Sequence, residues 1–189
     1  EASELIAACA GLWAEAYVTE PSVAIGESSK TISQVISRYG LKITLDELTM
    51  MQPMDNTRGT INDTMAFYKN PLADHKLLPA NELQSYNGGF TAARTTQPYW
   101  LESPHTIGSY EINNERKVGN PENPYAPTMR FIFSIDGHPL SLDRKLVYKY
   151  VNPAVGEIYQ PVDIAPPITA NIRNAVYIFN SQQPQTVQV

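Results

Sequence analysis

The sequence predicts a mainly β fold, with its strands arranged as a sandwich around one main core. Eleven tyrosines and 15 prolines among 189 residues indicate many extended segments and turns, because aromatic side chains suit half-buried strands and proline interrupts helices. The clearest hairpin has apolar residues at alternate positions up to Asp136-Gly137, a dipeptide that favours a tight turn; these residues are Met129, Phe131, Phe133 and Ile135. A chain of this length can form one domain of good size.

The composition argues against several classes of function. The formal net charge is -5, whereas nucleic-acid-binding proteins concentrate Lys and Arg on one face, so we expect no nucleic-acid partner. The mean hydropathy of -0.29 gives no indication of a membrane-spanning segment, and we expect no membrane insertion. The single cysteine, Cys9, excludes an internal disulfide and a cysteine-based zinc cage.

Residues 1–16 are predicted to form a leading helix at the junction with a preceding domain. Leu5, Cys9, Leu12 and Ala16 recur at helical spacing and would form an apolar stripe, in which Cys9 is a buried structural thiol. The stretch superficially matches a signal or lipoprotein segment, but such a segment needs a basic start, and no Lys or Arg precedes Lys30. We therefore expect the chain to be a fragment whose targeting segment is missing.

Beyond the helix, the pattern predicts strands joined by turns. Residues 32–39 have helix-like spacing, but their β-branched side chains and the following Gly40 favour a strand pair. A long connection with short strands is expected over 49–81. Asn87-Gly88-Gly89 predicts a tight hairpin between strands at 82–86 and 90–95.

The second half of the chain predicts the end of the sandwich. After Asp136-Gly137 the apolar alternation is interrupted once, between Leu142 and Leu146, which we interpret as a shift of phase and therefore as a β-bulge. Several prolines from Pro153 onward punctuate the sheet, and two further strands are expected at 176–179 and 186–189. We therefore predict a sandwich domain over 17–152, followed over 153–189 by a linker and the first strands of a second, incomplete β module.

The sequence assigns no catalytic and no metal-binding residue. His75, His105 and His138 each have a carboxylate nearby, but none belongs to a spaced ligand motif. Turn chemistry explains the pairing of Asp136 with His138. The chain also has no nucleophile elbow, phosphate-binding loop or dinucleotide fingerprint. A metal hydrolase remains an alternative only if these histidines converge with Asp or Glu around a metal ion.

Aromatic side chains are the remaining candidates for a binding site. Flat rings on loops can stack on sugars, because they combine an apolar face with a polar edge. The candidate stacking residues are Tyr86, Tyr99, Trp100 and Tyr125. The alternative is core packing, which a strand beginning at Tyr99-Trp100 would favour. A stand-alone carbohydrate-binding module would require Trp100 or Tyr125 to be exposed.

A series of motifs, taken in order, carries a family resemblance. The motifs are Gln97-Pro98-Tyr99-Trp100-Leu101, Gly119 with Pro121-Glu122-Asn123-Pro124, Val147-Tyr148-Lys149-Tyr150, Tyr159-Gln160-Pro161, Ala165-Pro166-Pro167, Val176-Tyr177-Ile178-Phe179 and Pro184-Gln185-Thr186-Val187. Together they resemble the region that follows the catalytic domain in LmbE-like (PIG-L) deacetylases of Bacteroidetes. The resemblance covers most of the chain.

The resemblance implies a role outside the catalytic centre. In that family the catalytic domain binds zinc through an Ala-His-Pro-Asp-Asp type motif and removes an N-acetyl group from a glucosamine-type sugar. The only His-Pro here is His138-Pro139, and Leu140-Ser141 follows it, so no catalytic residue or metal ligand carries over. Zinc would belong to the absent catalytic domain, and we expect no cofactor in this chain.

The resemblance also implies a location and partners. We expect an immunoglobulin-like β-sandwich with an N-terminal helix and trailing strands of a following module. It would act as an accessory domain that spaces, docks or positions a secreted or periplasmic sugar deacetylase. Its partners would be its own catalytic domain and polysaccharide.

Overall fold

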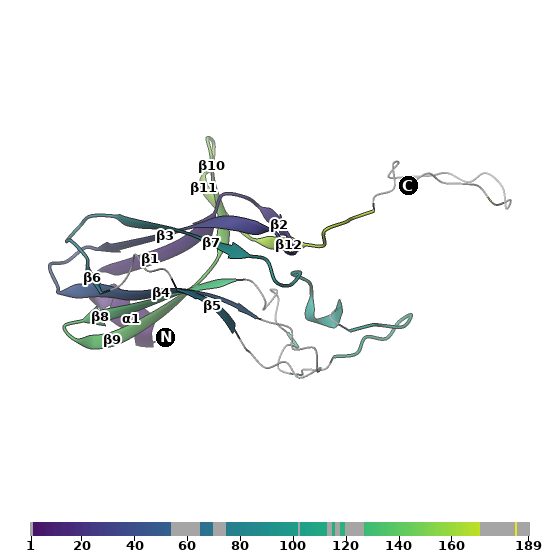
Figure 1. The fold of residues 1–189 in the computed structure, drawn as a ribbon, viewed down its shortest axis with the longest axis horizontal. Helices are drawn as coiled ribbons and strands as arrows, with labels where there is room; N and C mark the ends of the chain where they lie inside the picture. Colours follow the sequence, from purple (N-terminus) through teal and green to yellow (C-terminus); the bar gives the residue numbers. More distant parts are fainter. Residues whose placement is uncertain are drawn as a thin grey trace.

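A computed structural model describes residues 2–53, 65–69, 75–101, 103–112, 115, 118–119, 127–170 and 184. This described part of the chain is mainly β, with one α-helix, α1 (Ala2–Cys9), near the N-terminus. The strands form two facing sheets, so the β-sandwich with an N-terminal helix that the composition predicted is confirmed (Figure 1).

The first sheet has five strands in the order β11-β10-β1-β3-β7. Their bounds are β1 (Leu12–Val18), β3 (Ser28–Ser37), β7 (Gln84–Thr91), β10 (Val147–Asn152) and β11 (Gly156–Pro161). Most neighbours in this sheet are antiparallel, but β1 and β10 pair in parallel. A short parallel pair, β2 (Ser22–Ala24) with β12 (Asp163–Ala165), lies beside it.

The second sheet has the order β5-β4-β8-β9, and β6 also pairs with β4. Its strands are β4 (Ile43–Pro53), β5 (Met65–Lys69), β6 (Lys76–Leu77), β8 (Thr128–Ile135) and β9 (His138–Lys145). Side chains from both sheets fill the space between them, and among the largest fully buried ones are Ile43, Leu45, Phe131, Phe133 and Leu142. Each such side chain contributes about 1.5–3 kcal/mol through burial.

The leading helix is shorter than the predicted 1–16. It ends at Cys9, and Gly11 then adopts a positive φ of 64°, a conformation that ends helices readily. From Leu12 the chain is strand, with Leu12 and Ala16 on its buried face. Residues four apart share a face in a helix and also in a strand, so the Leu12–Ala16 spacing could not distinguish the two. Cys9 is exposed rather than buried.

An ion pair between Glu4 and Arg144 attaches the helix to one side of the sandwich. Arg144 on β9 donates two hydrogen bonds to the carboxylate of Glu4, at 2.6 and 2.9 Å, and its Nε donates to the carbonyl of Ala14 on β1 at 2.9 Å. β10 pairs with β1 only at Tyr17 and Val18, and the Arg144 side chain provides a hydrogen-bond donor for the carbonyl of Ala14, outside that pairing. Edges that stay open invite pairing with other chains, and Arg144 removes that risk at this point.

The strand predicted within 32–39 is confirmed as part of β3, but β3 does not pair with the strand after Gly40, because β4 belongs to the other sheet. The hairpin predicted at Asn87-Gly88-Gly89 is wrong. β7 runs straight through these residues and pairs with β3 from Gln84 to Thr91. Neither glycine has a positive φ. A Cβ added at Gly88 would lie 3.0 Å from Thr31 Oγ1 on β3, so the glycine permits close approach of a neighbouring strand, which is the other common reason for Gly within a strand.

The hairpin at Asp136-Gly137 is confirmed. Both residues have positive φ, 47° and 86°, as a two-residue hairpin turn requires. The interruption after Leu142 is not a bulge: β9 ends at Lys145, Leu146 is buried, and β10 begins at Val147 in the other sheet. Leu142 and Leu146 are four residues apart and so keep the same phase; the apolar alternation is only interrupted, at Arg144, just before the chain crosses from one sheet to the other.

The boundary predicted before Pro153 falls inside a hairpin. β11 pairs with β10, and β12 pairs with β2, so residues 153–165 belong to the same sandwich rather than to a second module. β12, late in the chain, joins the sandwich by pairing in parallel with β2, which lies near the N-terminus. The strands expected at 176–179 and 186–189 lie outside the described residues.

Candidate functional site

The four predicted stacking residues have different environments. Tyr86 on β7 is only 2% exposed and lies opposite Ser33 of β3, so its interpretation as a sugar-stacking residue is wrong. It faces inward because β7 is one continuous strand, in which Tyr86, Gly88 and Phe90 share the core face. Tyr125 lies outside the described residues.

Tyr99 and Trp100 lie on a short 3-10 turn, η2 (Tyr99–Leu101). The N–H of Leu101 donates to the carbonyl of Pro98 at 2.9 Å, which closes the turn. The two rings meet edge to face, with centroids 4.9 Å apart and planes at 86°. Trp100 is 39% exposed. The buried strand that would have hidden these rings does not form, and the turn presents an indole that Tyr99 supports from one side.

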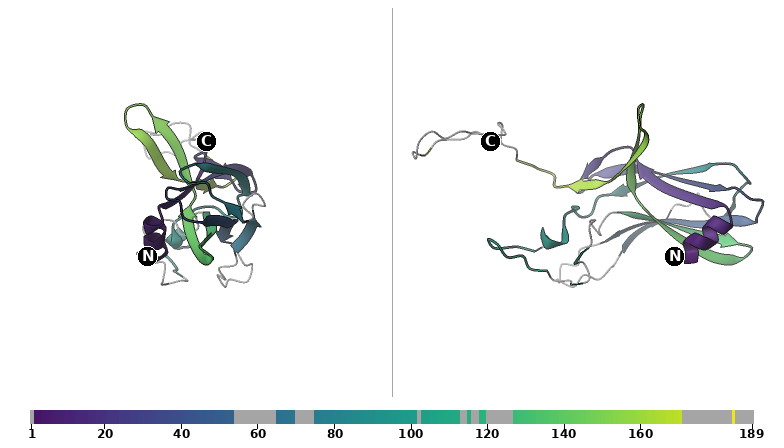
Figure 2. Two further views of the ribbon diagram at one scale, coloured as in Figure 1. Left: turned by 90° about the vertical axis from the view of Figure 1, so that its left-hand side faces the viewer. Right: turned by 180° about the vertical axis from the view of Figure 1, so that it is seen from behind.

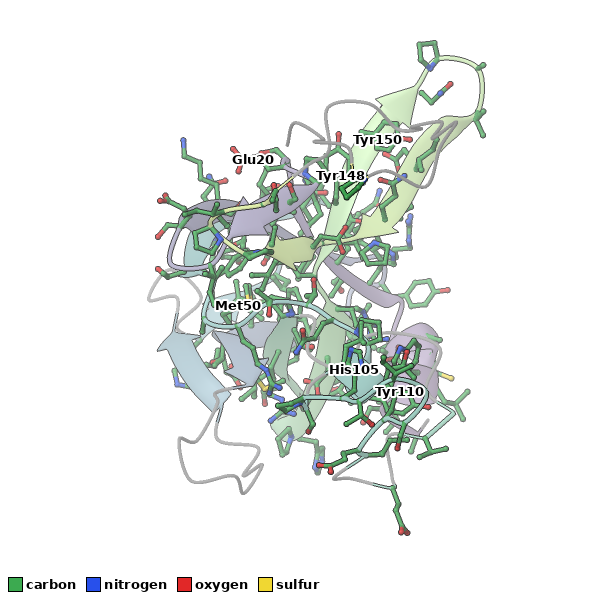
Figure 3. The ribbon with its side chains drawn as sticks, turned by 90° about the vertical axis from the view of Figure 1, so that its right-hand side faces the viewer. Glu20, Met50, His105, Tyr110, Tyr148 and Tyr150 are labelled. Atoms are coloured by element: carbon green, nitrogen blue, oxygen red, sulfur yellow. The ribbon has the colours of Figure 1, made fainter. Side chains whose placement is uncertain are left out.

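A second aromatic group follows in the same long connection between β7 and β8. His105 and Tyr110 stack at 5.0 Å with an angle of 39° between the planes, and both are exposed. The turn between them is closed by two backbone hydrogen bonds that link Thr106 and Ser109, and its tip is Ile107, which is fully exposed. Figure 3 shows His105 and Tyr110 beside each other at this end of the sandwich.

The histidines do not converge. His75 lies 3.1 Å from a carboxylate oxygen of Asp46, and Asp46 sits at a register shift between Leu45 and Glu47 in β4. Sequence reasoning considered only carboxylates close to His75 in the sequence and missed Asp46, which is 29 residues away. His138 begins β9 on the far hairpin. In the part of the chain that the structure describes, no three His, Cys, Asp or Glu residues are grouped to hold a metal ion.

Sequence reasoning also missed a charged network on the projecting β10–β11 hairpin. Lys149 Nζ donates to Glu15 on β1 at 2.8 Å and lies 3.3 Å from Glu157 on β11. The ammonium also lies between two rings, 5.1 Å from the centroid of Tyr17 and 5.4 Å from that of Tyr159. The side chains of Lys149 and Glu15 are only 15% and 13% exposed. Three strands are thus tied together by one cation.

The network shifts the proton affinities of its members. Burial of the Lys149 ammonium lowers its pKa, but hydrogen bonds to Glu15 and Glu157 outweigh burial, so the pKa is raised overall. The Tyr159 hydroxyl donates to Glu157 at 2.7 Å, which lowers the pKa of that carboxyl, with Lys149 adding to the effect. The same bond raises the pKa of Tyr159. All three groups keep their usual charges near neutral pH.

Two further tyrosines lie on the other face of the hairpin. Tyr148 and Tyr150 stack with centroids 5.2 Å apart and planes at 20° (Figure 3). Tyr148 packs against the core, so the stack continues the core outward along β10. The hairpin therefore has an aromatic face and a charged face, and neither was predicted as a site.

Comparison with known proteins adds little. No protein-family model and no curated protein matches the chain. Among solved structures, it is similar to the sporulation control protein Spo0M from Bacillus subtilis, with 11% identity and a TM-score of 0.35, covering 82% of this chain and 50% of that one. A β-glucosidase from Listeria innocua in complex with isofagomine has 12% identity and a TM-score of 0.30, covering 71% and 16%.

Similarities this weak carry no argument about function. The chain spans half the length of Spo0M and about a sixth of the β-glucosidase. Among the described residues, no helix is both long and apolar enough to cross a membrane.

Proposed function

We propose that this chain is a non-catalytic accessory domain that positions carbohydrate through the exposed aromatic group on η2. The observation that carries the proposal is Trp100, which lies on a closed turn with Tyr99 against it and with much of its surface in solvent. The resemblance to the region after the catalytic domain in LmbE-like deacetylases suggests the intact partner: a secreted, zinc-dependent sugar N-deacetylase domain of the same protein.

The physical basis is stacking between the indole and the apolar face of a sugar ring. Such contacts need a flat ring held in place and open on one side. The hydrogen bond between Leu101 and Pro98 fixes the backbone of η2, so little conformational entropy would be lost on binding. Tyr110 and His105 supply a second exposed ring pair in the same connection, which suits an oligosaccharide better than a single sugar.

The binding part of the proposal is tested by titrating the chain with N-acetylglucosamine oligomers and measuring heat by calorimetry. We expect binding by the unaltered chain and its loss in Trp100→Ala. The chain offers a matched control, because its other tryptophan, Trp13 on β1, is 41% exposed but lies on a different element. Trp13→Ala should bind as the unaltered chain does. Absence of binding by the unaltered chain, or equal losses in both variants, would contradict sugar stacking.

The accessory part is tested separately. Deacetylation of N-acetylglucosamine oligomers is measured with zinc for this chain and for the intact parent protein. Activity in the parent alone supports an accessory role. Activity in this chain would overturn it and direct attention to His75, His105 and His138.

A further inference from the structure

The β10–β11 hairpin projects beyond the sandwich as a two-stranded ribbon. β1 pairs with β10 only at Tyr17↔Val147 and Val18↔Tyr148. Past Tyr148 the two strands pair with each other, up to Asn152↔Gly156, and this part of the ribbon projects beyond the rest of the first sheet (Figures 1 and 2). An isolated two-stranded ribbon is marginally stable in water, and a third strand is what usually completes it.

β11 provides the longer free edge of this ribbon, because β10 is paired with β1 at Val147 and Tyr148. Within the described residues β11 pairs with β10 alone, so its outer edge presents backbone N–H and C=O groups to solvent. Natural edge strands are commonly protected by charges, proline or a covering element. β11 has a single charged residue, Glu157, and its proline, Pro161, is the last residue of the strand. Five of its six residues are exposed. The centre of the edge is thus able to accept another strand.

The sequence of β11 is complementary to itself in one antiparallel register. With Ile158 on a twofold axis perpendicular to the sheet, Ile158 faces Ile158 of a second copy, and Glu157 faces Tyr159 of that copy. The Tyr159 hydroxyl, which donates to Glu157 within one chain at 2.7 Å, would donate to Glu157 of the second copy instead, so an equivalent hydrogen bond replaces the one that is given up. No like charges are directly opposed, which is the arrangement that would destabilise a cross-strand pair.

We propose that two copies of this chain associate edge to edge through β11, in antiparallel register centred on Ile158. The first sheets of the two copies then form one continuous sheet across a twofold axis. Homodimers with twofold symmetry generally use the same self-complementary surface on both subunits. The network of Lys149 with Glu15 and Glu157 holds each ribbon rigid before association, which lowers the entropy lost on pairing.

The first experiment measures the mass of the full chain in solution by light scattering over a range of concentrations. We expect a mass that approaches twice the 21.0 kDa of one chain. Ile158→Lys and Ile158→Glu should each be monomeric, because like charges would meet on the axis. An equimolar mixture of the two should recover the dimer, which a merely unfolded variant would not do. Val151→Lys, on β10 of the same hairpin, should remain dimeric.

The proposal is overturned if the unaltered chain stays monomeric, if the single variants still dimerise, or if their mixture does not. The register is tested by disulfide trapping in a Cys9→Ser background. Opposed residues in antiparallel strands have Cα atoms about 4.5–5.5 Å apart, within reach of a disulfide. Ile158→Cys should therefore form a covalent dimer with oxidised glutathione and Val151→Cys should not. Equal trapping at both positions would contradict the register.

Discussion

Two hairpins follow each other in this chain and differ in what stabilises them. β8–β9 lies within the second sheet, and its buried residues alternate with half-buried or exposed ones along both strands. β10–β11 has no buried residue on either strand and is instead tied by ion pairs and stacked tyrosines. The first hairpin is part of the core, whereas the second is a projection attached to it.

The difference shows why one hairpin was predictable and the other was not. Burial on one face produces a period of two in the sequence, and Phe131 and Phe133 display it. In the second hairpin Tyr148, Lys149 and Tyr150 follow one another, and both faces of the strand carry residues that are half-buried or exposed, so no apolar alternation marks a buried face. Its stability depends on contacts with Glu15, more than 130 residues away, which no local pattern reveals.

The largest expected effect is in the first hairpin. Phe133 is fully buried and stacks on Phe131 at 6.0 Å, so Phe133→Ala should lower the free energy of unfolding by about 3–5 kcal/mol, measured by urea denaturation. The control is Val151→Ala on β10, which is 69% exposed and should change it by less than about 0.5 kcal/mol. Comparable losses at both positions would mean that the second hairpin also belongs to the cooperative core.

The turns of the two hairpins permit a closer comparison. Gly137 and Gly156 have similar positive φ angles, 86° and 94°, so alanine at either position introduces a strain of about 1–2 kcal/mol. Gly137→Ala should lower the global stability by that amount. Gly156→Ala should leave the midpoint of urea denaturation nearly unchanged and instead speed amide hydrogen exchange in 149–160, because a projecting ribbon opens locally. A large global loss in Gly156→Ala would contradict local opening.

Much of the fold was readable from the sequence where burial is one-sided. The Asp136-Gly137 turn was predicted because alternation and turn chemistry agree there, and β3 was predicted because its β-branched side chains and the following Gly40 outweighed a helix-like spacing. Two errors have one cause, which is that a local pattern has two meanings. Glycines at 88 and 89 fit a turn or a close strand approach, and the spacing of Leu12 and Ala16 fits a helix or a strand. Pairing with β3 decides both cases.

The candidate site was predicted only in part. Trp100 was identified because a flat aromatic ring on a loop can stack on a sugar, and its exposure depends on the η2 turn, which no periodicity signals. Tyr86 was misplaced because the false hairpin put it at the end of a strand. The Lys149 network could not be predicted, since its members come from β1, β10 and β11.

The third effect concerns that network and is smaller. Lys149→Met should speed amide exchange in the β10–β11 hairpin about two- to fivefold at neutral pH, the range that an ion pair near the surface supports. Because the pKa of Lys149 is raised above its ordinary 10.5, its stabilisation is fully present below pH 10.5 and is lost as the pH rises through the higher folded-state pKa. When the Lys149 Cε resonance is followed by NMR, it should titrate at a higher pH than that of a free lysine. An ordinary titration would show that the network does not form in solution.

The smallest expected effect comes from removing one of two tyrosine hydroxyls, that of Tyr86 in the core or that of Tyr159 on the hairpin. The Tyr86 hydroxyl is buried with no hydrogen-bond partner among the described residues, and burial raises its pKa. Tyr86→Phe should therefore leave the free energy of unfolding unchanged or raise it by up to about 1 kcal/mol, because a buried hydroxyl without a partner costs free energy. Tyr159→Phe removes a hydroxyl that donates to Glu157, so it should speed exchange in the hairpin without changing global stability. If Tyr86→Phe is destabilising, the Tyr86 hydroxyl has a hydrogen-bond partner in solution.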